Sequence, residues 1–474
     1  MKKASFMAGA LALVFTLTGA ITSSVRAQTI VPPPNSDPFY VPPAGYASLP
    51  NGMILSDRTI NAEYLLPFLS TNVTNQLGSA GAALLPAIST LQNLKINAYQ
   101  VLYKSTDSNN QPVAEVVTIL VPQETWSGSG TRPLVAFESA EDSVSNICEP
   151  SYTLRAGLLG QPASQASGSQ LDMLLGLIPL TEGYAVAIAD YEGPQSEWLA
   201  GAQAGHAVLD GIRAALHYAP DGLSSTTPVG LSGYSGGGGA AGWAAALRQV
   251  YAPELNIVGA TVGAASNSDL SVVYKANDGT LEEGILPQAV VGLSRAYPNA
   301  GVAQYFNAAG NQLLAAAANQ NQCLITQAIT FAFDGALENY TINPSVNLVN
   351  SPPGGILFPV NSLVDQPLVP DMPILNYNDE FDGFVPVTGD NEVALKYCKA
   401  GANVEVMRTS TPLPFSNGTP VGVVVHGIAA IEGALPALHY LTNRFKGLPP
   451  RNDCPYSVLW SVNDGMPYQA LNTQ

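Results

Sequence analysis

The chain is long, apolar and acidic. It has 474 residues, of which 46% are hydrophobic, and 35 acidic residues outnumber 18 basic ones to give a formal net charge of −17. This charge excludes nucleic acid as a partner, because binding a phosphate backbone requires a basic surface. The apolar fraction excludes intrinsic disorder, because it supports a core large enough to offset the conformational entropy of folding.

The N-terminus has the pattern of a cleaved secretory signal. A short basic segment precedes an apolar run over residues 4–20, and residues 25–27 (VRA) provide the small side chains of a cleavage site. The run is short for a membrane span, which takes about 20 apolar residues. We therefore predict a signal peptide at 1–27 and a secreted mature protein at 28–474, without a transmembrane anchor. Its location would be extracellular, or periplasmic if the host has an outer membrane.

The mature chain alternates strand-like and helix-like segments, which predicts an α/β fold with a mainly parallel sheet. The predicted strands are Ala98–Ser105, Ala114–Pro122, Arg132–Glu138, Tyr184–Asp190, Pro228–Tyr234, Ile257–Val262, Met372–Tyr377, Val404–Arg408 and Val421–Val425. The predicted helices are Gln170–Leu180, Gly205–Tyr218, Ala240–Val250 and Pro436–Phe445, the last with a proline in its first turn.

The interval from about 268 to 360 interrupts this alternation. It contains helical sequence rich in alanine and asparagine and no clear core strand. We therefore predict one α/β domain over 28–474 with a cap inserted in this interval, rather than a second independent domain.

A G-x-S-x-G motif centred on Ser235 follows a predicted strand and precedes a predicted helix. This arrangement is typical of the nucleophile elbow of α/β-hydrolases, where a side chain at either flanking glycine would collide with the neighbouring elements. Four successive glycines, Gly236–Gly239, would each cost up to about 1 kcal/mol in a purely structural helix. The motif therefore favours Ser235 as a nucleophile over the alternative, a flexible glycine loop after a buried strand.

A serine nucleophile needs a histidine base, and in this fold the acid and the histidine follow the serine in the chain. That order leaves His426 and His439. His439 falls inside the predicted helix Pro436–Phe445. His426 follows the predicted strand Val421–Val425, which would place it on a loop at the carboxyl edge of the sheet, where the serine emerges. We therefore predict His426 as the base.

Three carboxylates follow the predicted strand Met372–Tyr377 and are candidates for the acid that orients the histidine. Asp382 precedes Gly383 in a tight turn that would aim its carboxylate back at the site. Asp382 is therefore favoured, and Asp379 and Glu380 remain alternatives.

The oxyanion hole of such an enzyme needs two fixed donors. Gly236 would supply one backbone N–H at a helix N-terminus, where the helix dipole also favours negative charge. The second donor should lie in the loop after the predicted strand Arg132–Glu138, at residues 139–143 (SAEDS). These residues alone do not indicate which of them it is.

The four cysteines are even in number and widely spaced, which in an exported protein predicts two disulfides. Spacing leaves three pairings open among Cys148, Cys323, Cys398 and Cys454. Without a CxxC motif or clustered histidines, we predict no metal site.

Several segments resemble the secretory lipase family, whose best-known members are fungal lipases of the lipase A type with bacterial relatives. They lie in the expected order over nearly all of the mature chain, and they are Asp37–Gly45, Glu141–Tyr152, Asp190–Leu216, Gly233–Ala245, residues 382–386 (DGFVP) and Pro436–Gly447. The resemblance implies an α/β-hydrolase fold with a helical cap over an acyl-binding tunnel. This chain departs from the family in its loop lengths and in an alanine-rich cap.

The resemblance also implies site residues. It implies a triad of Ser235, Asp382 and His426, and it implies that Asp142 is the second oxyanion residue beside Gly236.

The same resemblance implies disulfides. It pairs Cys148 with Cys323 and Cys398 with Cys454, and the second bridge would tie down the loop that bears His426.

The leading hypothesis is a secreted serine ester hydrolase of the lipase type, which cleaves acylglycerols or other hydrophobic esters through an acyl-enzyme. Its expected partner is a hydrophobic ester substrate, in the lipase case at a lipid–water interface, and no cofactor is required. One alternative is a carboxylesterase or polyester esterase for short or soluble esters. A second alternative is a non-catalytic secreted binding protein on a hydrolase fold.

Overall fold

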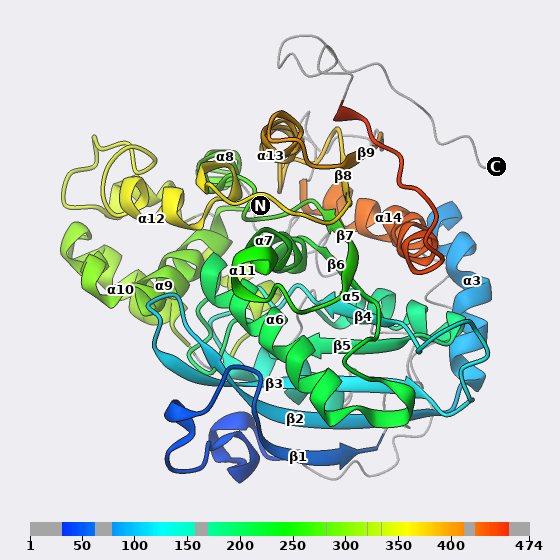
Figure 1. Ribbon diagram of the computed structural model, residues 1–474. Helices are drawn as coiled ribbons and strands as arrows, with labels where there is room; N and C mark the ends of the chain where they lie inside the picture. Colours follow the sequence, from blue (N-terminus) through cyan, green and yellow to red (C-terminus); the bar gives the residue numbers. More distant parts are fainter. Residues whose placement is uncertain are drawn as a thin grey trace.

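A nine-stranded sheet runs through the centre of the computed structural model (Figure 1). The structure describes residues 31–61, 78–156, 169–280, 282–319, 321–332, 334–411 and 422–454. The predicted signal peptide at 1–27 lies outside these residues. The strands are β1 (Ile54–Ile60), β2 (Ile96–Thr106), β3 (Pro112–Pro122), β4 (Leu134–Glu138), β5 (Ala185–Ala189), β6 (Val229–Tyr234), β7 (Ile257–Gly263), β8 (Ile374–Asp379) and β9 (Val404–Thr409).

The strand order is β1-β2-β3-β5-β4-β6-β7-β8-β9. Strands β1 to β3 are antiparallel to their neighbours, and β4 to β9 are all parallel to one another. The predicted α/β fold with a mainly parallel sheet is therefore confirmed. Every residue of β4, β5, β6 and β8 is buried, because helices cover both faces of a parallel sheet.

Helices pack on both faces of the sheet. The helices are α3 (Gly78–Asn93), α4 (Pro150–Ala156), α5 (Ser169–Gly176), α6 (Gly201–Tyr218), α7 (Gly236–Tyr251), α8 (Leu270–Asn277), α9 (Leu286–Ala296), α10 (Ala308–Ala317), α11 (Leu324–Phe331), α12 (Gly354–Asn361), α13 (Val387–Lys399) and α14 (Gly422–Phe445). Helices α6, α7 and α13 share one hydrophobic cluster with the sheet, and α3, α4, α5 and α14 share another.

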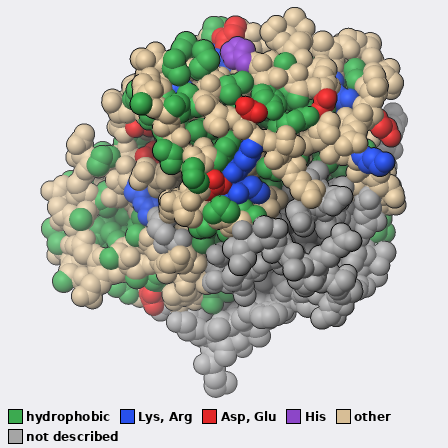
Figure 2. Space-filling model, turned by 90° about the horizontal axis from the view of Figure 1, so that it is seen from below, with side chains coloured by type: hydrophobic (Ala, Val, Ile, Leu, Met, Phe, Trp, Pro, Cys, Tyr) green, Lys and Arg blue, Asp and Glu red, His purple; other side chains and the backbone are tan. Residues whose placement is uncertain are grey.

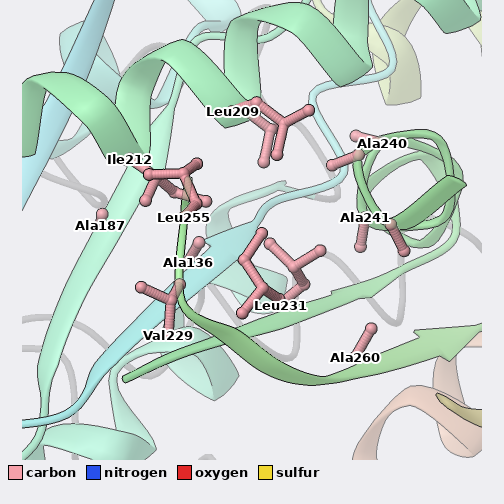
Figure 3. Packing of buried hydrophobic residues seen from close by; sticks show 14 of the residues in the cluster. Ala136, Ala187, Leu209, Ile212, Val229, Leu231, Ala240, Ala241, Leu255 and Ala260 are labelled. Atoms are coloured by element: carbon pink, nitrogen blue, oxygen red, sulfur yellow. The ribbon is translucent and has the colours of Figure 1, made fainter. Parts of the chain in front are cut away.

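Small side chains bring α7 close to the sheet. Figure 3 shows Ala240 and Ala241 of α7 near Leu231 of β6, with Leu209 and Ile212 of α6 lying above the same part of the sheet. Since β6 and α7 flank Ser235 directly, this packing fixes both ends of the turn that carries it.

The predicted strand Val421–Val425 is wrong. Residue 421 lies outside the described residues, and from Gly422 onward the chain is helical. Helix α14 has 24 residues and absorbs the predicted helix Pro436–Phe445 as well, so Pro436 lies inside the helix and not in its first turn. A short apolar run does not distinguish a buried strand from a buried helix by periodicity.

The burial of α14 follows the helical period. Its buried positions include Val425, Ala429, Ala437 and Leu441, spaced by multiples of four, and this stripe packs against β6, β7 and β8. By length and composition alone, α14 is the one helix in the described ranges that could cross a membrane. Here the same apolar character serves its packing on the sheet.

Helices α8 to α12 lie between β7 and β8, over the interval predicted to be a cap. Of these, α9, α10 and α12 lie at the left in Figure 1, and the interval has a hydrophobic cluster of its own. Trp198 and Val144, from loops outside the interval, belong to the same cluster. We refer to α8–α12 below as the cap.

Charged side chains are sparse on the surface. On the face shown in Figure 2, a few acidic and basic groups are scattered among hydrophobic and uncharged polar side chains. This agrees with a charged fraction of only 11% in the whole chain.

Candidate active site

Ser235 occupies the turn between β6 and α7. Its backbone angles are φ 59° and ψ −124°, a region that residues other than glycine rarely adopt. Three backbone hydrogen bonds hold this conformation. The Ser235 N–H donates to the Gly263 carbonyl at 2.9 Å, and the Ser235 carbonyl accepts from Gly239 N at 2.9 Å and from Ser266 N at 3.1 Å.

The glycines of the motif are required by close backbone approaches. A side-chain carbon at Gly233 would collide with the carbonyl of Gly237, and one at Gly237 would collide with the carbonyl of Glu138 on the neighbouring strand. The motif therefore forms a strand–turn–helix elbow, and not the flexible glycine loop of the structural alternative.

Asp382 and His426 are in direct contact. Nδ1 of His426 lies 2.6 Å from Oδ2 of Asp382, and both residues are buried. The other carboxylate oxygen, Oδ1, accepts the backbone N–H groups of Phe384 and Val385, each at 2.9 Å. The turn after β8 thus aims the carboxylate at the histidine. With Nδ1–H donating to Asp382, Nε2 of His426 is left as an acceptor, and it is buried without a hydrogen-bond partner.

His426 lies on a helix, and not on the loop predicted for it. It is the fifth residue of α14, and its ring centroid is 4.8 Å from that of Tyr234, the residue before Ser235. His439 belongs to the same helix but is exposed. The structure therefore brings His426, and not His439, to the edge of the sheet where the elbow lies.

The alternative acids have other partners. Oδ1 of Asp379 accepts from the backbone N–H of Phe381 at 2.8 Å, and its Oδ2 accepts from the Thr409 hydroxyl at 2.9 Å. The backbone N–H of Glu380 donates to the Thr409 carbonyl at 3.0 Å, which ties the turn to β9. Of the three carboxylates, Asp382 is the one that contacts His426.

The side chain of Asp142 lies against Gly236. A side-chain carbon at Gly236 would collide with Oδ1 of Asp142, and the same Oδ1 accepts from Nε1–H of Trp198 at 2.8 Å. Burial raises the pKa of Asp142 to about 6, while the Trp198 hydrogen bond and the charge of His426 act to lower it. Near neutral pH the carboxyl is therefore partly protonated, and a protonated carboxyl can donate a hydrogen bond.

Three backbone N–H groups of the loop at 139–143 donate to buried acceptors. Ala140 donates to Asp172, Glu141 donates to the Tyr191 hydroxyl and Ser143 donates to Glu192, at 2.8, 3.3 and 3.3 Å respectively. The side chain of Asp142 faces the start of α7.

Residues that support this loop were missing from the sequence-based site. Trp198 and Glu192 lie in the segment Asp190–Leu216, which carries the resemblance but for which no role was predicted. Asp172 lies in α5. No motif of residue types marks an indole N–H as the partner of a carboxyl, so the resemblance of this segment was the only available signal.

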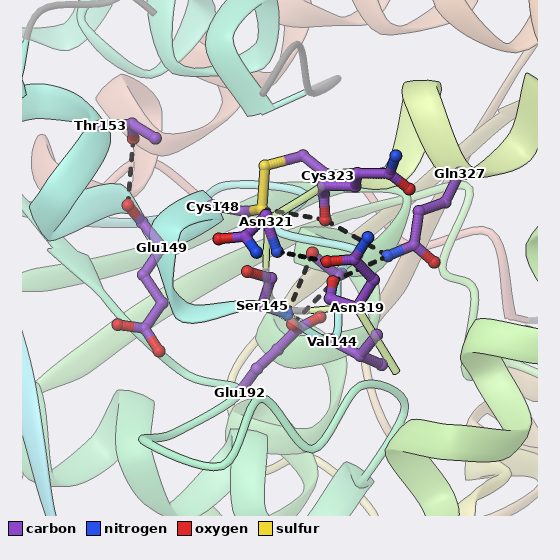
Figure 4. Close-up of a disulfide and its surroundings, with 12 residues drawn as sticks. Val144, Ser145, Cys148, Glu149, Thr153, Glu192, Asn319, Asn321, Cys323 and Gln327 are labelled. Carbon is purple, nitrogen blue, oxygen red and sulfur yellow. Dashed lines mark hydrogen bonds between the residues drawn. A yellow bond between two sulfur atoms is a disulfide. The ribbon is translucent and has the colours of Figure 1, made fainter. Parts of the chain in front are cut away.

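The structure pairs the cysteines as the resemblance implies. Cys148 and Cys323 have Cα atoms 5.8 Å apart, and Figure 4 shows their bridge in one view with Val144, the residue that follows the loop at 139–143. Cys398 and Cys454 have Cα atoms 5.0 Å apart.

The expected effect of the second bridge needs correction. Cys454 lies beyond the end of α14, whereas His426 is near its start, so this bridge fastens the segment that follows α14 to α13. Among the described residues, no group of three or more His, Cys, Asp or Glu side chains is placed to hold a metal ion.

Comparison with known proteins gives one consistent result. The family model described as secretory lipase matches residues 160–453. A Mycobacterium tuberculosis protein named probable inactive lipase is 32% identical over 418 residues, which cover 88% of this chain and 83% of that protein. Lipase 10 of Candida albicans is 31% identical over 450 residues, which cover 93% of this chain and 87% of that lipase.

Solved structures agree. Lipase A of Candida antarctica in its closed state superimposes with a TM-score of 0.73 at 26% identity, covering 90% of each chain. A cell-wall-degrading esterase of Xanthomonas oryzae has a TM-score of 0.60 at 17% identity and covers 82% of this chain and 99% of that one. At that identity the likeness concerns the fold alone.

Proposed function

This chain belongs to the secretory lipase family, and we propose that it is a secreted serine hydrolase that cleaves hydrophobic carboxylic esters through an acyl-enzyme. The observation that carries the proposal is the contact of Asp382 with His426 beside the strained elbow of Ser235. Strained backbone persists where the surrounding structure imposes it, and it is concentrated at functional sites.

The proposed reaction begins at Ser235. Its Oγ attacks the ester carbonyl while Nε2 of His426 takes the hydroxyl proton, and Asp382 holds the imidazole by its Nδ1–H and stabilises the imidazolium that forms. His426 then gives the proton to the leaving alcohol as the tetrahedral intermediate collapses to the acyl-enzyme. A water molecule, deprotonated by the same histidine, attacks the acyl carbon and releases the carboxylic acid and free Ser235.

The negative oxygen of each tetrahedral intermediate needs two donors. We assign one to the backbone N–H of Gly236 and the other to the protonated carboxyl of Asp142. Support for the side chain comes from the close approach of its Oδ1 to Gly236.

A hydrophobic substrate fits the surface beside the site. Phe381 directly precedes Asp382, and its side chain is 47% exposed. Val423 lies three residues before His426 and is 38% exposed. The ring of Phe384 lies 5.2 Å from that of His426. Exposed apolar side chains grouped at a site favour an apolar ligand.

The name of the Mycobacterium tuberculosis relative keeps the non-catalytic alternative in view. Against it stands the buried contact of Asp382 with His426 beside the elbow of Ser235.

The test is hydrolysis of an ester series, from p-nitrophenyl acetate to p-nitrophenyl palmitate and an emulsified triacylglycerol, by the wild-type protein and by Ser235→Ala. We expect turnover that rises with chain length and above the solubility limit, and a loss of at least about 10⁴-fold in the variant. Rates that fall steadily with chain length would identify an esterase for short or soluble esters. Absence of turnover in folded wild-type protein would identify a non-catalytic protein.

A further inference from the structure

We propose that Trp198 and cap helix α9 position the carboxyl of Asp142, so that the cap is part of the support of the oxyanion hole. This inference rests on the proposed function and adds residues to it. Trp198 is 5% exposed, and its indole N–H donates to Oδ1 of Asp142 at 2.8 Å.

The hydrogen bond from Trp198 fixes the orientation of the Asp142 carboxyl. An indole N–H is a donor only and does not titrate in the physiological range. Oδ1 must therefore present a lone pair to Trp198, which leaves Oδ2 to carry the acid proton. Because both oxygens lie near Gly236, the bond selects one orientation of the donor relative to the start of α7.

Trp198 is itself held by the cap. Gly292 of α9 lies so close that a side-chain carbon there would be 2.6 Å from the carbonyl oxygen of Trp198 and 2.8 Å from its Cβ. The indole belongs to the hydrophobic cluster of the cap, together with Val291 and Leu293 on either side of that glycine. The backbone of α9 therefore packs directly on Trp198.

Arg295 makes a second connection from the same helix. It lies three residues after Gly292 and so on the same face of α9. One guanidinium nitrogen donates to the Val144 carbonyl at 2.7 Å and to the Gln195 carbonyl at 2.9 Å. Val144 follows the loop at 139–143, which we call the oxyanion loop, and Gln195 lies in the loop that carries Trp198. Arg295 therefore joins the loop of Asp142 to the loop of Trp198.

The Cys148–Cys323 disulfide is a third connection between the cap and the end of the oxyanion loop (Figure 4). Two of these connections come from α9 and the third from the start of α11. A shift of the cap would therefore be transmitted to the loop of Asp142.

The test is Trp198→Phe, which removes the N–H and keeps an aromatic ring in the cluster. The matched control is Trp243→Phe in α7, because the Trp243 indole is 3% exposed and its Nε1 has no hydrogen-bond partner. We expect kcat on a long-chain ester to fall about 10- to 100-fold in Trp198→Phe, with KM nearly unchanged. The control should keep the wild-type kcat.

The pH profile is the second readout. The Trp198 hydrogen bond lowers the pKa of Asp142, so its removal should raise that pKa and move the alkaline limb of kcat to higher pH. The titratable groups that face Asp142 are Asp172 of α5, Tyr191 and Glu192 of the loop after β5, and His426 of α14. None of them is changed by the substitution, so a shift of the limb reports the lost bond.

Gly292→Ala provides an independent test if Trp198→Phe does not fold. It alters the packing of α9 on Trp198 without touching Asp142, and we expect a smaller fall in kcat on the same ester. A Trp198→Phe enzyme with the kcat and pH profile of the control would overturn the inference, as would a Gly292→Ala enzyme with wild-type kcat. Wild-type protein without turnover that depends on Ser235 would instead refute the proposed function, and the inference with it.

Discussion

The two sides of Ser235 are built differently. On one side, Asp382 and His426 meet directly at 2.6 Å, held by the turn after β8 and by a helix packed on the sheet. On the other side, Asp142 depends on Trp198 and on buried acceptors that hold its loop. In the proposed mechanism, the acid–base side is therefore complete within the sheet and its helices, whereas the oxyanion side also depends on residues of the cap.

The largest effect is expected on the acid–base side. His426→Ala removes the base and should lower kcat at least about 10⁴-fold while changing the free energy of unfolding little. His439→Ala changes an exposed residue of the same helix and should leave activity within about twofold. Steady-state hydrolysis and thermal denaturation of both variants measure this. A His426→Ala enzyme with nearly wild-type kcat would show that His426 is not the general base.

A smaller fall in kcat is expected when the proposed oxyanion donor Asp142 is changed. Asp142→Ala removes the side-chain donor and should lower kcat about 10²- to 10³-fold. Asp142→Asn keeps a donor that does not ionise, so it should retain much more activity than the alanine variant.

The pH dependence of these variants tests the protonated carboxyl. In the wild type, kcat should fall as the pH rises through the Asp142 pKa of about 6, because the carboxyl then loses its proton. In Asp142→Asn this fall should be absent. Equal kcat in the alanine and asparagine variants would mean that the donor is a backbone N–H instead.

The smallest expected effect is on the pH dependence of the free energy of unfolding. Near the oxyanion loop, burial and mutual repulsion raise the pKa of Glu149 and Glu192 well above the ordinary value, and burial raises that of Asp190 to about 7. Unfolded carboxyls titrate near pH 4. Between about pH 4 and 7 the folded state therefore binds more protons, and the free energy of unfolding contributed by these groups falls as the pH rises.

Urea denaturation from pH 4 to 7 measures this contribution. Glu149→Gln should reduce the downward slope by up to about 1.4 kcal/mol per pH unit, the equivalent of one proton, whereas Glu124→Gln at an exposed position should leave the slope unchanged. If the free energy of unfolding had the same pH slope in both variants, Glu149 would not be a neutral buried carboxyl in the folded protein.

Most of the sheet and the contact of Asp382 with His426 could be predicted from the sequence, for physical reasons. The catalytic roles of these two residues stay predictions. Strands β4, β5, β6 and β8 are buried throughout and read as apolar runs. Strand β1 has mostly half-exposed residues and polar side chains at 56–58, so no such run marked it. The turn of Asp382 was predictable from local turn chemistry, since an Asx side chain bonds its own following backbone.

The remaining features depend on tertiary contacts. The apolar run before His426 is compatible with a strand or a helix, and packing on the sheet decides for α14. Trp198 donates a hydrogen bond to a residue 56 positions away, and no local pattern specifies that pairing. Features formed by residues close together in the chain, such as the turn of Asp382, could therefore be predicted from the sequence. The contact of Trp198 with Asp142 required the structure.

The central claim is that Ser235 is an activated nucleophile, and covalent labelling tests it most directly. The folded mature protein would be incubated with a fluorophosphonate bearing a long alkyl chain and analysed by intact mass and peptide mapping. We predict one adduct per chain, located on Ser235, with labelling abolished in Ser235→Ala and slowed at least about 10⁴-fold in His426→Ala. A folded wild-type protein that takes up no label, or takes it up equally in Ser235→Ala, would contradict the account.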